Sequence, residues 1–281
     1  LGDVYKRQSQ SRLDEMSDNK MNVSIIGVGA MGGAIAAGLL HCSFPKDALT
    51  LSNPSQKALE PFADKGVRVT NSNTEAAASA DVVMVVVKPW LVEQVIKEIK
   101  PVIDYTRQSL VVVAAGISSG NLTQWLDKNG TLPQIFLGMP NTAIALGESM
   151  TFIVPVNANP ETIDKVKQLF DLTGTCLVID EAHLPAATTL ASCGIAYAMR
   201  YIRASVEGGV ELGFKAALAQ EIVVQTVKGA AALLSIPGSH PESEIDKVTT
   251  PGGLTIRGLN EMEHAGFTSA VIRGLKAGIK S

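Results

Sequence analysis

The sequence predicts an α/β fold, with a doubly wound parallel sheet in its N-terminal part and an all-helical C-terminal domain. Between residues 21 and 40 a short apolar strand, a glycine-rich turn and a helix of small residues follow one another. Strand-like and helix-like segments then alternate as far as about residue 180, after which the chain is rich in alanine and has a helical period. Parallel strands joined by helices form a doubly wound sheet.

The turn after the first strand carries a Gly-x-Gly-x-x-Gly motif at Gly27, Gly29 and Gly32. A strand, this turn and a helix in that order are typical of a Rossmann-type dinucleotide-binding domain. Gly27 is expected to make the tight turn, Gly29 to admit a pyrophosphate and Gly32 to let helix and strand touch. Ala30 and Met31 would begin the helix whose free amides hold the phosphates. The alternative is an ordinary glycine-rich turn without a ligand.

The other elements of this part follow from hydrophobic period and from helix signals. The predicted strands are residues 23–26, 49–52, 67–69, 82–87, 110–114 and 135–139. The fourth strand is apolar throughout, which indicates a central strand buried on both faces. Helices are predicted over 54–63 and 89–99, each with proline near its first turn, and from Asn159, with Gly174 as the stop signal.

These patterns divide the chain into three parts. Residues 1–20 are polar, lack a hydrophobic period and are interpreted as a disordered or artefactual extension. Residues 21–180 form the predicted dinucleotide-binding domain and residues 181–281 the helical domain. Helices are expected over 185–213 and 216–234, with a break at 237–241 and helices again from about 254. Small residues in this half suggest helices that pack between subunits.

Composition narrows the function classes. The 281 residues are 46% hydrophobic and 18% charged, as in ordinary globular proteins. A net charge of −3 offers no electrostatic attraction for nucleic acid or an anionic membrane, and neither partner is predicted. No apolar run reaches the length of a membrane span, and no signal-peptide pattern opens the chain.

Cysteine and histidine usage indicates a cytoplasmic protein without a metal site. Three widely spaced cysteines, Cys42, Cys176 and Cys193, form no Cys-x-x-Cys pair, which suits reduced thiols in the cytosol. The four histidines show no metal-ligand spacing. We expect them at the surface or in helix caps; they are His41, His183, His240 and His264.

The end of the second strand indicates which nicotinamide cofactor binds. A carboxylate there would hold a free ribose 2′-hydroxyl and repel a 2′-phosphate. This chain has Ser52, Asn53 and Ser55 instead, with Lys57 one helical turn further on. The missing carboxylate favours NADPH, with NADH as the alternative. Serine and asparagine also favour turns and N-caps, which is the interpretation without a ligand.

Three further segments carry candidate site residues. Lys88 ends the fourth strand, where it would reach a cofactor ribose or be a solvated strand end. Asn141 ends the sixth strand on the same edge and would bond nicotinamide or substrate, or simply form a turn. Gly252 and Gly253 precede a helix, so their exposed amides would hold a carboxylate, unless the segment is a plain loop with an N-cap.

The absent motifs limit the chemistry. No Gly-x-Ser-x-Gly elbow supports a hydrolase. The helical half lacks an Asn with a Lys four residues later, the pair that 3-hydroxyacid dehydrogenases of similar fold need for acid–base work on an alcohol. A reductase without an evident general acid indicates a substrate already primed for hydride, such as an imine.

Together these segments resemble the pyrroline-5-carboxylate reductase family from Met21 onward. The resemblance rests on the glycine turn and on residues 87–89, 114–117, 139–142, 251–256 and 259–267. The last two segments lie in the helical half, and generic dinucleotide domains lack them.

The resemblance implies reduction of the C=N bond of 1-pyrroline-5-carboxylate to L-proline with NADPH or NADH, the last step of proline biosynthesis. It implies that Thr255 places its hydroxyl near the ring nitrogen. The implied cofactor-binding residues beyond the glycine turn are Ser52, Asn53, Asn73, Lys88, Ala115 and Asn141. The implied substrate-binding residues are Cys193, Thr250, Gly252, Gly253, Leu254 and Thr255. The family dimerises through its helical domain, so we expect a homodimer, with a decamer as a larger assembly.

Several positions depart from the family pattern. Leu137 stands where an arginine is usual. Thr250 stands where serine is usual, and Leu254 replaces a small residue or threonine. Cys193 and Ile195 replace serine and proline in a helix that should flank the substrate. These changes leave two alternatives: a reductase of another cyclic imine or keto acid, and a catalytically silent NADPH-binding regulator. The intact glycine loop and its threonine count against a silent protein.

Overall fold

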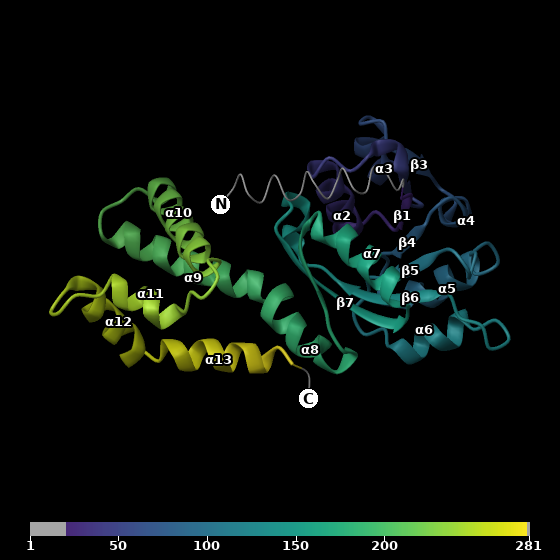
Figure 1. The fold of residues 1–281 in the computed structure, drawn as a ribbon. Helices are drawn as coiled ribbons and strands as arrows, with labels where there is room; N and C mark the ends of the chain where they lie inside the picture. The colour runs from purple at the N-terminus through teal and green to yellow at the C-terminus, as the bar shows by residue number, and fades with distance from the viewer. Residues whose placement is uncertain (1–20, 280–281) are drawn as a thin grey trace. The chain divides into compact units, whose positions relative to one another are not determined.

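The structure, a computed structural model, describes residues 21–279. The predicted extension at residues 1–20 lies outside them. The chain divides between Thr188 and Thr189 into an α/β unit and a helical unit (Figure 1). The sequence placed this division earlier, after residue 180, and the roles assigned to the two parts stay predictions.

The first unit contains one eight-stranded sheet in the order β3-β2-β1-β4-β5-β6-β7-β8. All neighbouring strands are parallel except β6 and β7, which are antiparallel. The strands are β1 (Val23–Ile26), β2 (Leu49–Ser52), β3 (Arg68–Thr70), β4 (Val82–Val85), β5 (Ser109–Val112), β6 (Gln134–Met139), β7 (Ser149–Asn157) and β8 (Gly174–Val178). This sheet confirms the predicted doubly wound α/β class.

The prediction missed β7 and β8. Gly174 had been interpreted as a helix stop, but the helix ends at Asp171 and Gly174 begins the edge strand β8. Its φ is +142°, and a Cβ there would lie 2.1 Å from the carbonyl oxygen of Ser149 on β7. Only glycine allows the two strands to approach this closely, and a distant partner strand cannot be inferred from a local helix signal.

The core lies on both faces of the sheet, as the uninterrupted apolar run at β4 predicted. Val82 and Met84 face one cluster of buried side chains, and Val83 and Val85 face the other. Successive strand residues point to opposite faces, so a strand covered on both sides is apolar at every position. The strand itself ends at Val85, two residues before the predicted end.

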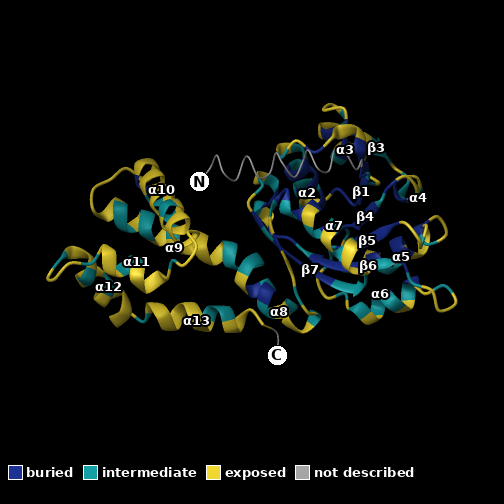
Figure 2. Ribbon diagram, in the orientation of Figure 1, coloured by how far each residue is buried: buried dark blue, intermediate teal, exposed yellow. Residues whose placement is uncertain are grey.

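Helices cover the two faces separately (Figures 1 and 2). One face is covered by α2 (Ala30–His41), α3 (Gln56–Ala63) and α7 (Pro160–Asp171). The other is covered by α4 (Asn73–Ala78), α5 (Pro89–Ile99) and α6 (Ser119–Leu126). Short helical turns η1 (Lys46–Ala48), η2 (Thr142–Leu146) and η3 (Glu181–His183) and the helix α8 (Leu184–Ala187) complete the unit.

The helical unit begins within η4 (Thr188–Ser192), a π-helical turn that interrupts the predicted helix over 185–213. It continues with α9 (Gly194–Glu211), α10 (Ala216–Leu234), α11 (Pro241–Lys247), α12 (Leu254–His264) and α13 (Phe267–Ala277). The end of α13 is held by η4, because the Thr189 hydroxyl donates to the Leu275 carbonyl at 2.9 Å. A Cβ on Gly278 would lie 2.4 Å from that hydroxyl, so glycine permits the contact.

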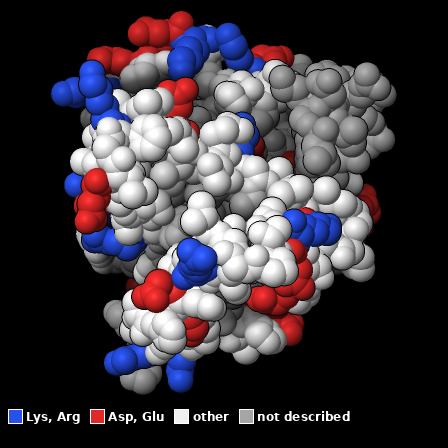
Figure 3. Space-filling model, turned by 90° about the vertical axis from the view of Figure 1, so that its left-hand side faces the viewer, with Lys and Arg blue, Asp and Glu red and all other residues white. Residues whose placement is uncertain are grey.

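Helices α9 to α13 bury little of their own apolar surface. Ala219 is the one buried residue in these five helices as the structure describes them, and Figure 2 shows them mostly exposed. Figure 3 views the molecule from the side of these helices and shows wide uncharged areas between groups of charge. α10 is long and apolar enough to cross a membrane, by length and composition only, so the expectation that no apolar run reaches this length is wrong. Exposed apolar surface of this extent usually marks an interaction site.

Candidate functional site

The glycine turn between β1 and α2 has the geometry that a dinucleotide requires. Gly27 has φ +98°, and a Cβ there would lie 2.2 Å from the carbonyl oxygen of Val86, just past β4. A Cβ on Gly32 would lie 1.9 Å from the carbonyl oxygen of Gly27. Nothing lies within 4 Å of the corresponding position on Gly29. Two glycines therefore permit close packing, and the third leaves open space above the turn.

The N-terminus of α2 adds free hydrogen-bond donors to that open space. Its N-cap residue, Gly29, provides no side-chain cap, and no acidic residue stands in the first turn, where Ala30 and Met31 lie. The first amides of a helix have no intrahelical acceptor and carry the positive end of the helix dipole. An uncapped N-terminus beside open space therefore fits a pyrophosphate.

Asn53, at the end of β2, is tied to the same turn. Its Oδ1 accepts a hydrogen bond from the Val28 amide at 3.0 Å, and its Nδ2 donates to the Ser55 carbonyl at 3.3 Å. The backbone joins the two segments as well, because the Gly27 amide donates to the Ser52 carbonyl at 2.8 Å. The sequence suggested Asn53 as a cofactor residue but not that it fastens the turn.

Ser52 and Asn73 form a buried pair below this point. The Ser52 side chain is 0% exposed, and its hydroxyl donates to Asn73 Oδ1 at 2.8 Å. Asn73 Nδ2 donates in turn to the Glu98 carboxylate on α5 at 2.9 Å. Both amide atoms of Asn73 are thus engaged within the protein, and contacts from these two side chains to a cofactor stay a prediction. Glu98 was not anticipated, since nothing local in the sequence pairs it with Asn73.

The other predicted cofactor residues follow the ends of β4, β5 and β6, which are parallel to β1 and so end at the same edge of the sheet. Lys88 is exposed and is the N-cap residue of α5. Ala115 is exposed after β5. Asn141 is buried, and its Oδ1 caps η2 by accepting from the Ala143 amide at 3.1 Å. Ligands of open α/β sheets bind at this edge.

A glycine in α2 that the motif does not include also shapes this edge. A Cβ on Gly38 would lie 2.0 Å from the carbonyl oxygen of Ile144 in η2. Helix α2 and η2 therefore touch through backbone, which fixes the turn that Asn141 caps. The run of small residues in α2 was the sequence signal for such a contact, but it did not name the partner.

The loop before α12 is the candidate substrate site in the helical unit. Thr250 to Gly253 form a β-turn in which the Gly253 amide donates to the Thr250 carbonyl at 3.0 Å. Pro251 and Gly252, with φ +66°, occupy its central positions, as in a type II turn. Gly253 then serves as the N-cap residue of α12 without a side-chain cap. The first amides of α12, from Leu254 and Thr255 onward, are therefore available to a carboxylate.

Two further features of this loop bear on ligand binding. Thr255 is exposed, and Leu254 is 85% exposed in the first turn of α12. A Cβ on Gly253 would lie 2.4 Å from Thr250 Oγ1, so the second glycine is needed for packing within the loop. The predicted substrate-binding residues between 250 and 255 thus lie in this β-turn and in the first turn of α12 that follows it.

Cys193 lies just after the π-helical turn η4. It is half-buried and is the N-cap residue of α9. The preceding Ser192 has a buried hydroxyl for which the structure gives no hydrogen-bond partner. π-helical turns often occur at functional sites, and no pattern of residues in the sequence predicted this one.

Metal-binding and thiol chemistry find little support. Within residues 21–279 no group of three or more His, Cys, Asp or Glu side chains is placed to hold a metal ion. Burial raises the pKa of Cys42, with Glu148 adding to the effect, and raises the pKa of Cys176 to about 12. The four histidines are exposed, as predicted, and His240 Nδ1 accepts from the Glu242 amide at the start of α11.

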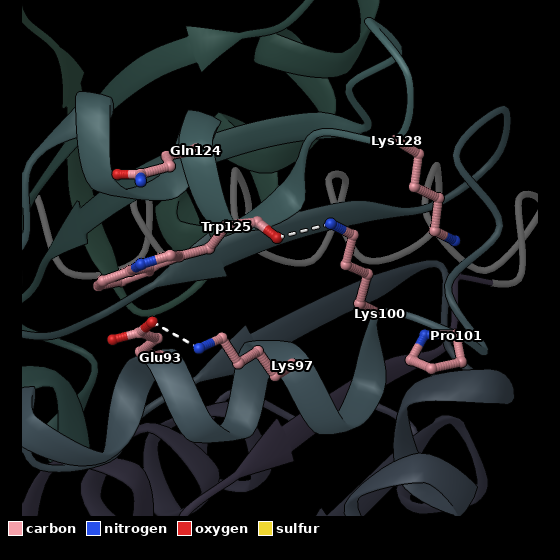
Figure 4. Close-up of a pocket in the computed structure, with 7 residues that line it drawn as sticks. All are labelled: Glu93, Lys97, Lys100, Pro101, Gln124, Trp125 and Lys128. Carbon is pink, nitrogen blue, oxygen red and sulfur yellow. Dashed lines mark hydrogen bonds and ion pairs between the residues drawn. The ribbon is translucent and has the colours of Figure 1, made fainter.

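A basic groove between α5 and α6 is separate from the predicted residues. Its volume is about 530 Å³, and Figure 4 shows its lining. Lys100 Nζ donates to the Trp125 carbonyl at 2.9 Å, and Lys97 pairs with Glu93 at 2.7 Å. Lys100 therefore links the end of α5 to the end of α6, whereas the Lys97–Glu93 pair lies within α5.

Family models match both parts of the chain. Residues 181–281 match the model described as pyrroline-5-carboxylate reductase dimerisation. Residues 22–116 match the model described as NADP oxidoreductase, coenzyme F420-dependent. The first of these supports homo-oligomerisation through the helical unit and explains why its helices expose so much apolar surface.

Named relatives extend the match over nearly the whole chain. Pyrroline-5-carboxylate reductase 1 of Dictyostelium discoideum is 38% identical over 267 residues, which cover 90% of this chain but only 48% of that protein. The chain thus spans about half the length of that relative. Pyrroline-5-carboxylate reductase 2 of the same organism is 35% identical, with 92% and 90% covered. The Pisum sativum enzyme is 34% identical, with 92% and 93% covered.

Solved structures agree with the sequence relatives. The pyrroline carboxylate reductase of Plasmodium falciparum, solved with NADP bound, is 26% identical with a TM-score of 0.80, and 92% of this chain and 95% of that chain are covered. The enzyme of Streptococcus pyogenes is 31% identical with a TM-score of 0.77, covering 92% and 96%. These findings confirm the predicted resemblance: the chain belongs to the pyrroline-5-carboxylate reductase family, NAD(P)H-dependent oxidoreductases of the final step of proline biosynthesis.

Proposed function

We propose that this protein reduces 1-pyrroline-5-carboxylate to L-proline and prefers NADPH as hydride donor. The observation that supports this substrate is the N-terminus of α12, which has no side-chain cap and directly follows the turn at Thr250 to Gly253. Free helix amides bind a carboxylate without needing an arginine. The open glycine turn before α2 provides the dinucleotide site in the same chain.

The proposed roles follow the reaction. The amides at the start of α12 hold the substrate carboxylate, and the Thr255 hydroxyl lies near the ring nitrogen. A bound NADPH would supply a hydride to the imine carbon, which is C2 of 1-pyrroline-5-carboxylate and becomes C5 of proline, and a proton from solvent would complete the N–H. Neither step needs a strong protein base, so positioning and exclusion of water supply most of the rate enhancement.

The preference for NADPH is inferred from the end of β2. Residues 52–57 contain no carboxylate, and Asn53 is held beside the glycine turn by the Val28 amide. A ribose 2′-phosphate would therefore meet amide and hydroxyl groups rather than a negative charge. Lys57 is exposed on α3, one helical turn further along.

We further infer a homodimer that assembles into a decamer and works in the cytoplasm. The apolar surface of α9 to α13 supports the dimer, because one copy would cover the other. Cys42, Cys176 and Cys193 are all free thiols, which supports a reducing compartment.

The decisive experiment follows NADPH oxidation by absorbance with three samples: 1-pyrroline-5-carboxylate, a six-membered cyclic imino acid, and no imine. Rapid oxidation with the five-membered imine alone supports the proposal. Preference for the six-membered imine would mean that the protein reduces a different cyclic imine. The replacements at Cys193 and Ile195 favour that alternative. Binding of NADPH without turnover of either imine would indicate a regulator that only senses the dinucleotide.

A further inference from the structure

Trp90 is a large aromatic side chain left in solvent at the edge of the sheet where ligands bind. It is the second residue of α5 and is 75% exposed. Within residues 21–279 the structure gives it no aromatic pair and no cation–π contact. A tryptophan buries on the order of 200 Å² when covered, so an occupant of this side chain would remove a large apolar area from water. Exposed apolar side chains are common in this chain, and what distinguishes Trp90 is its place at this edge of the sheet.

The segment that carries Trp90 touches the glycine turn. A Cβ on Gly27 would lie 2.2 Å from the Val86 carbonyl oxygen and 2.7 Å from Val87 Cγ1. Two residues separate Val87 from Trp90: Lys88, the N-cap residue of α5, and Pro89, its first residue. Side chains in the first turn of a helix lean toward its N-terminus. The indole is therefore directed toward the same edge as the turn.

The order of the strands decides which half of a dinucleotide lies near Trp90. β2 lies on one side of β1, and β4 lies on the other. The ribose 2′ position of the adenosine half is read at the end of β2, where Asn53 bonds the turn. A dinucleotide whose pyrophosphate crosses the turn therefore extends its nicotinamide half past the end of β4, toward Trp90.

We propose that Trp90 is a binding residue for the nicotinamide half of the cofactor, where its indole covers one side of the nicotinamide riboside. Indole contact with a flat ring removes apolar surface from water on both partners and restricts the ring to one orientation. Trp90 would thereby add affinity for the whole dinucleotide but none for its adenosine half. This inference rests on the proposed dinucleotide site at the glycine turn.

A nucleotide that lacks the nicotinamide half tests whether Trp90 contacts that half of the cofactor. Binding of NADPH and of adenosine 2′,5′-bisphosphate is measured by calorimetry for the wild type, Trp90→Ala and Trp90→Phe. We expect Trp90→Ala to lower the affinity for NADPH about tenfold, because one aromatic contact is lost. The affinity for the bisphosphate should stay within about twofold of the wild-type value. Trp90→Phe should recover most of the NADPH affinity.

Two matched variants serve as controls. Leu91→Ala removes the neighbouring, partly exposed apolar side chain on α5, and Trp125→Phe alters the second tryptophan in the groove between α5 and α6. Both should bind NADPH and the bisphosphate like the wild type. Thermal unfolding and mass in solution should be the same for all variants.

The possible failures are distinguishable. If Trp90→Ala weakened the binding of NADPH and of the bisphosphate equally, Trp90 would support the glycine turn itself. If the binding of both were unchanged, Trp90 would not contact the bound cofactor. Either result overturns the inference. Failure of the wild type to bind either nucleotide would instead refute the dinucleotide site on which it rests.

Discussion

Asn53 illustrates, at the scale of single residues, how one side chain can serve both the fold and the choice of cofactor. Its Oδ1 accepts from the Val28 amide at 3.0 Å and so fastens the glycine turn to the end of β2. The same position is where a carboxylate would select against a 2′-phosphate. An aspartate there would keep the acceptor and add a charge.

Asn53→Asp should therefore shift preference from NADPH toward NADH. The ratio of kcat/KM for NADPH to that for NADH is expected to fall about tenfold, or about 1.4 kcal/mol, in steady-state assays with each cofactor. Asn159→Asp is the matched control, because it adds the same charge at the N-cap of α7, and it should leave the ratio unchanged. An unaltered ratio in the aspartate variant would refute the 2′-phosphate assignment.

Thr255 is the second residue whose chemistry is open to a direct test. Thr255→Ala should lower turnover roughly a hundredfold to a thousandfold, the loss measured for one hydrogen-bond donor in an active site, with little change in NADPH affinity by calorimetry. Thr249→Ala is the control in the same loop, since that hydroxyl donates to the Ile245 carbonyl at 2.7 Å. Full turnover in Thr255→Ala removes this hydroxyl from the mechanism.

At the scale of the element, the glycine turn divides its work among three positions with different surroundings. Gly27 faces the backbone of Val86, and Gly32 faces the carbonyl oxygen of Gly27, whereas Gly29 faces open space. Packing and ligand binding are therefore carried by different glycines of one motif.

This division predicts that alanine at Gly32 lowers stability, whereas alanine at Gly29 lowers affinity for NADPH. Gly32→Ala places a methyl 1.9 Å from a backbone oxygen, so the free energy of unfolding should fall by about 1–3 kcal/mol in denaturant titrations. Gly29→Ala meets nothing within 4 Å and should keep its stability while losing at least about tenfold in NADPH affinity. A Gly29→Ala variant that binds NADPH normally would argue against a pyrophosphate at this turn.

At the scale of the whole molecule, the two units are stabilised differently. The α/β unit buries two clusters of side chains, one on each face of its sheet. Helices α9 to α13 expose apolar side chains such as Met199 and Leu212, which a second copy of the chain would cover in the proposed dimer.

Met199→Glu should therefore lower the mass of the protein in solution. Met199 is 61% exposed and lines a groove between α9 and α10. A second copy packed there would bury the added carboxylate at a desolvation cost, and Arg203 in the same groove already pairs with Glu207. Light scattering measures the mass, and NADPH binding by the α/β unit should persist. Lys97→Glu, a charge reversal on α5, is the control, and an unchanged mass in Met199→Glu would exclude this groove from the interface.

The buried thiol of Cys176 predicts a pH dependence of the stability of the α/β unit. Burial, with Asp171 adding to the effect, raises the pKa of Cys176 from 9.0 to about 12. Above pH 9 the unfolded thiol loses its proton while the folded one keeps it, so the unfolded state gains stability as pH rises toward 12.

This thiol should remove about 1 kcal/mol of unfolding free energy between pH 9 and 10. The comparison is with Cys176→Ala, which is less stable at every pH but should show a smaller decrease over this interval in denaturant titrations. Parallel curves for the two proteins would contradict the assignment.

The class of the fold, the family, the six parallel strands and the glycine turn could all be predicted from the order of residue types along the chain. Hydrophobic period and turn residues are local properties, so β1 and β2 fall where they were predicted. The short segments that resemble the family, in both halves of the chain, are local patterns too, and the predicted function rested on them.

The tertiary structure alone decided the partners of these local features. It placed Gly174 against Ser149 and so created an edge strand from an apparent helix stop. It directed the Ser52 hydroxyl inward to Asn73 and the Asn53 oxygen to Val28. A hydrogen bond or a backbone contact between residues distant in the sequence depends on how the elements pack, and no local pattern of residue types specifies that packing.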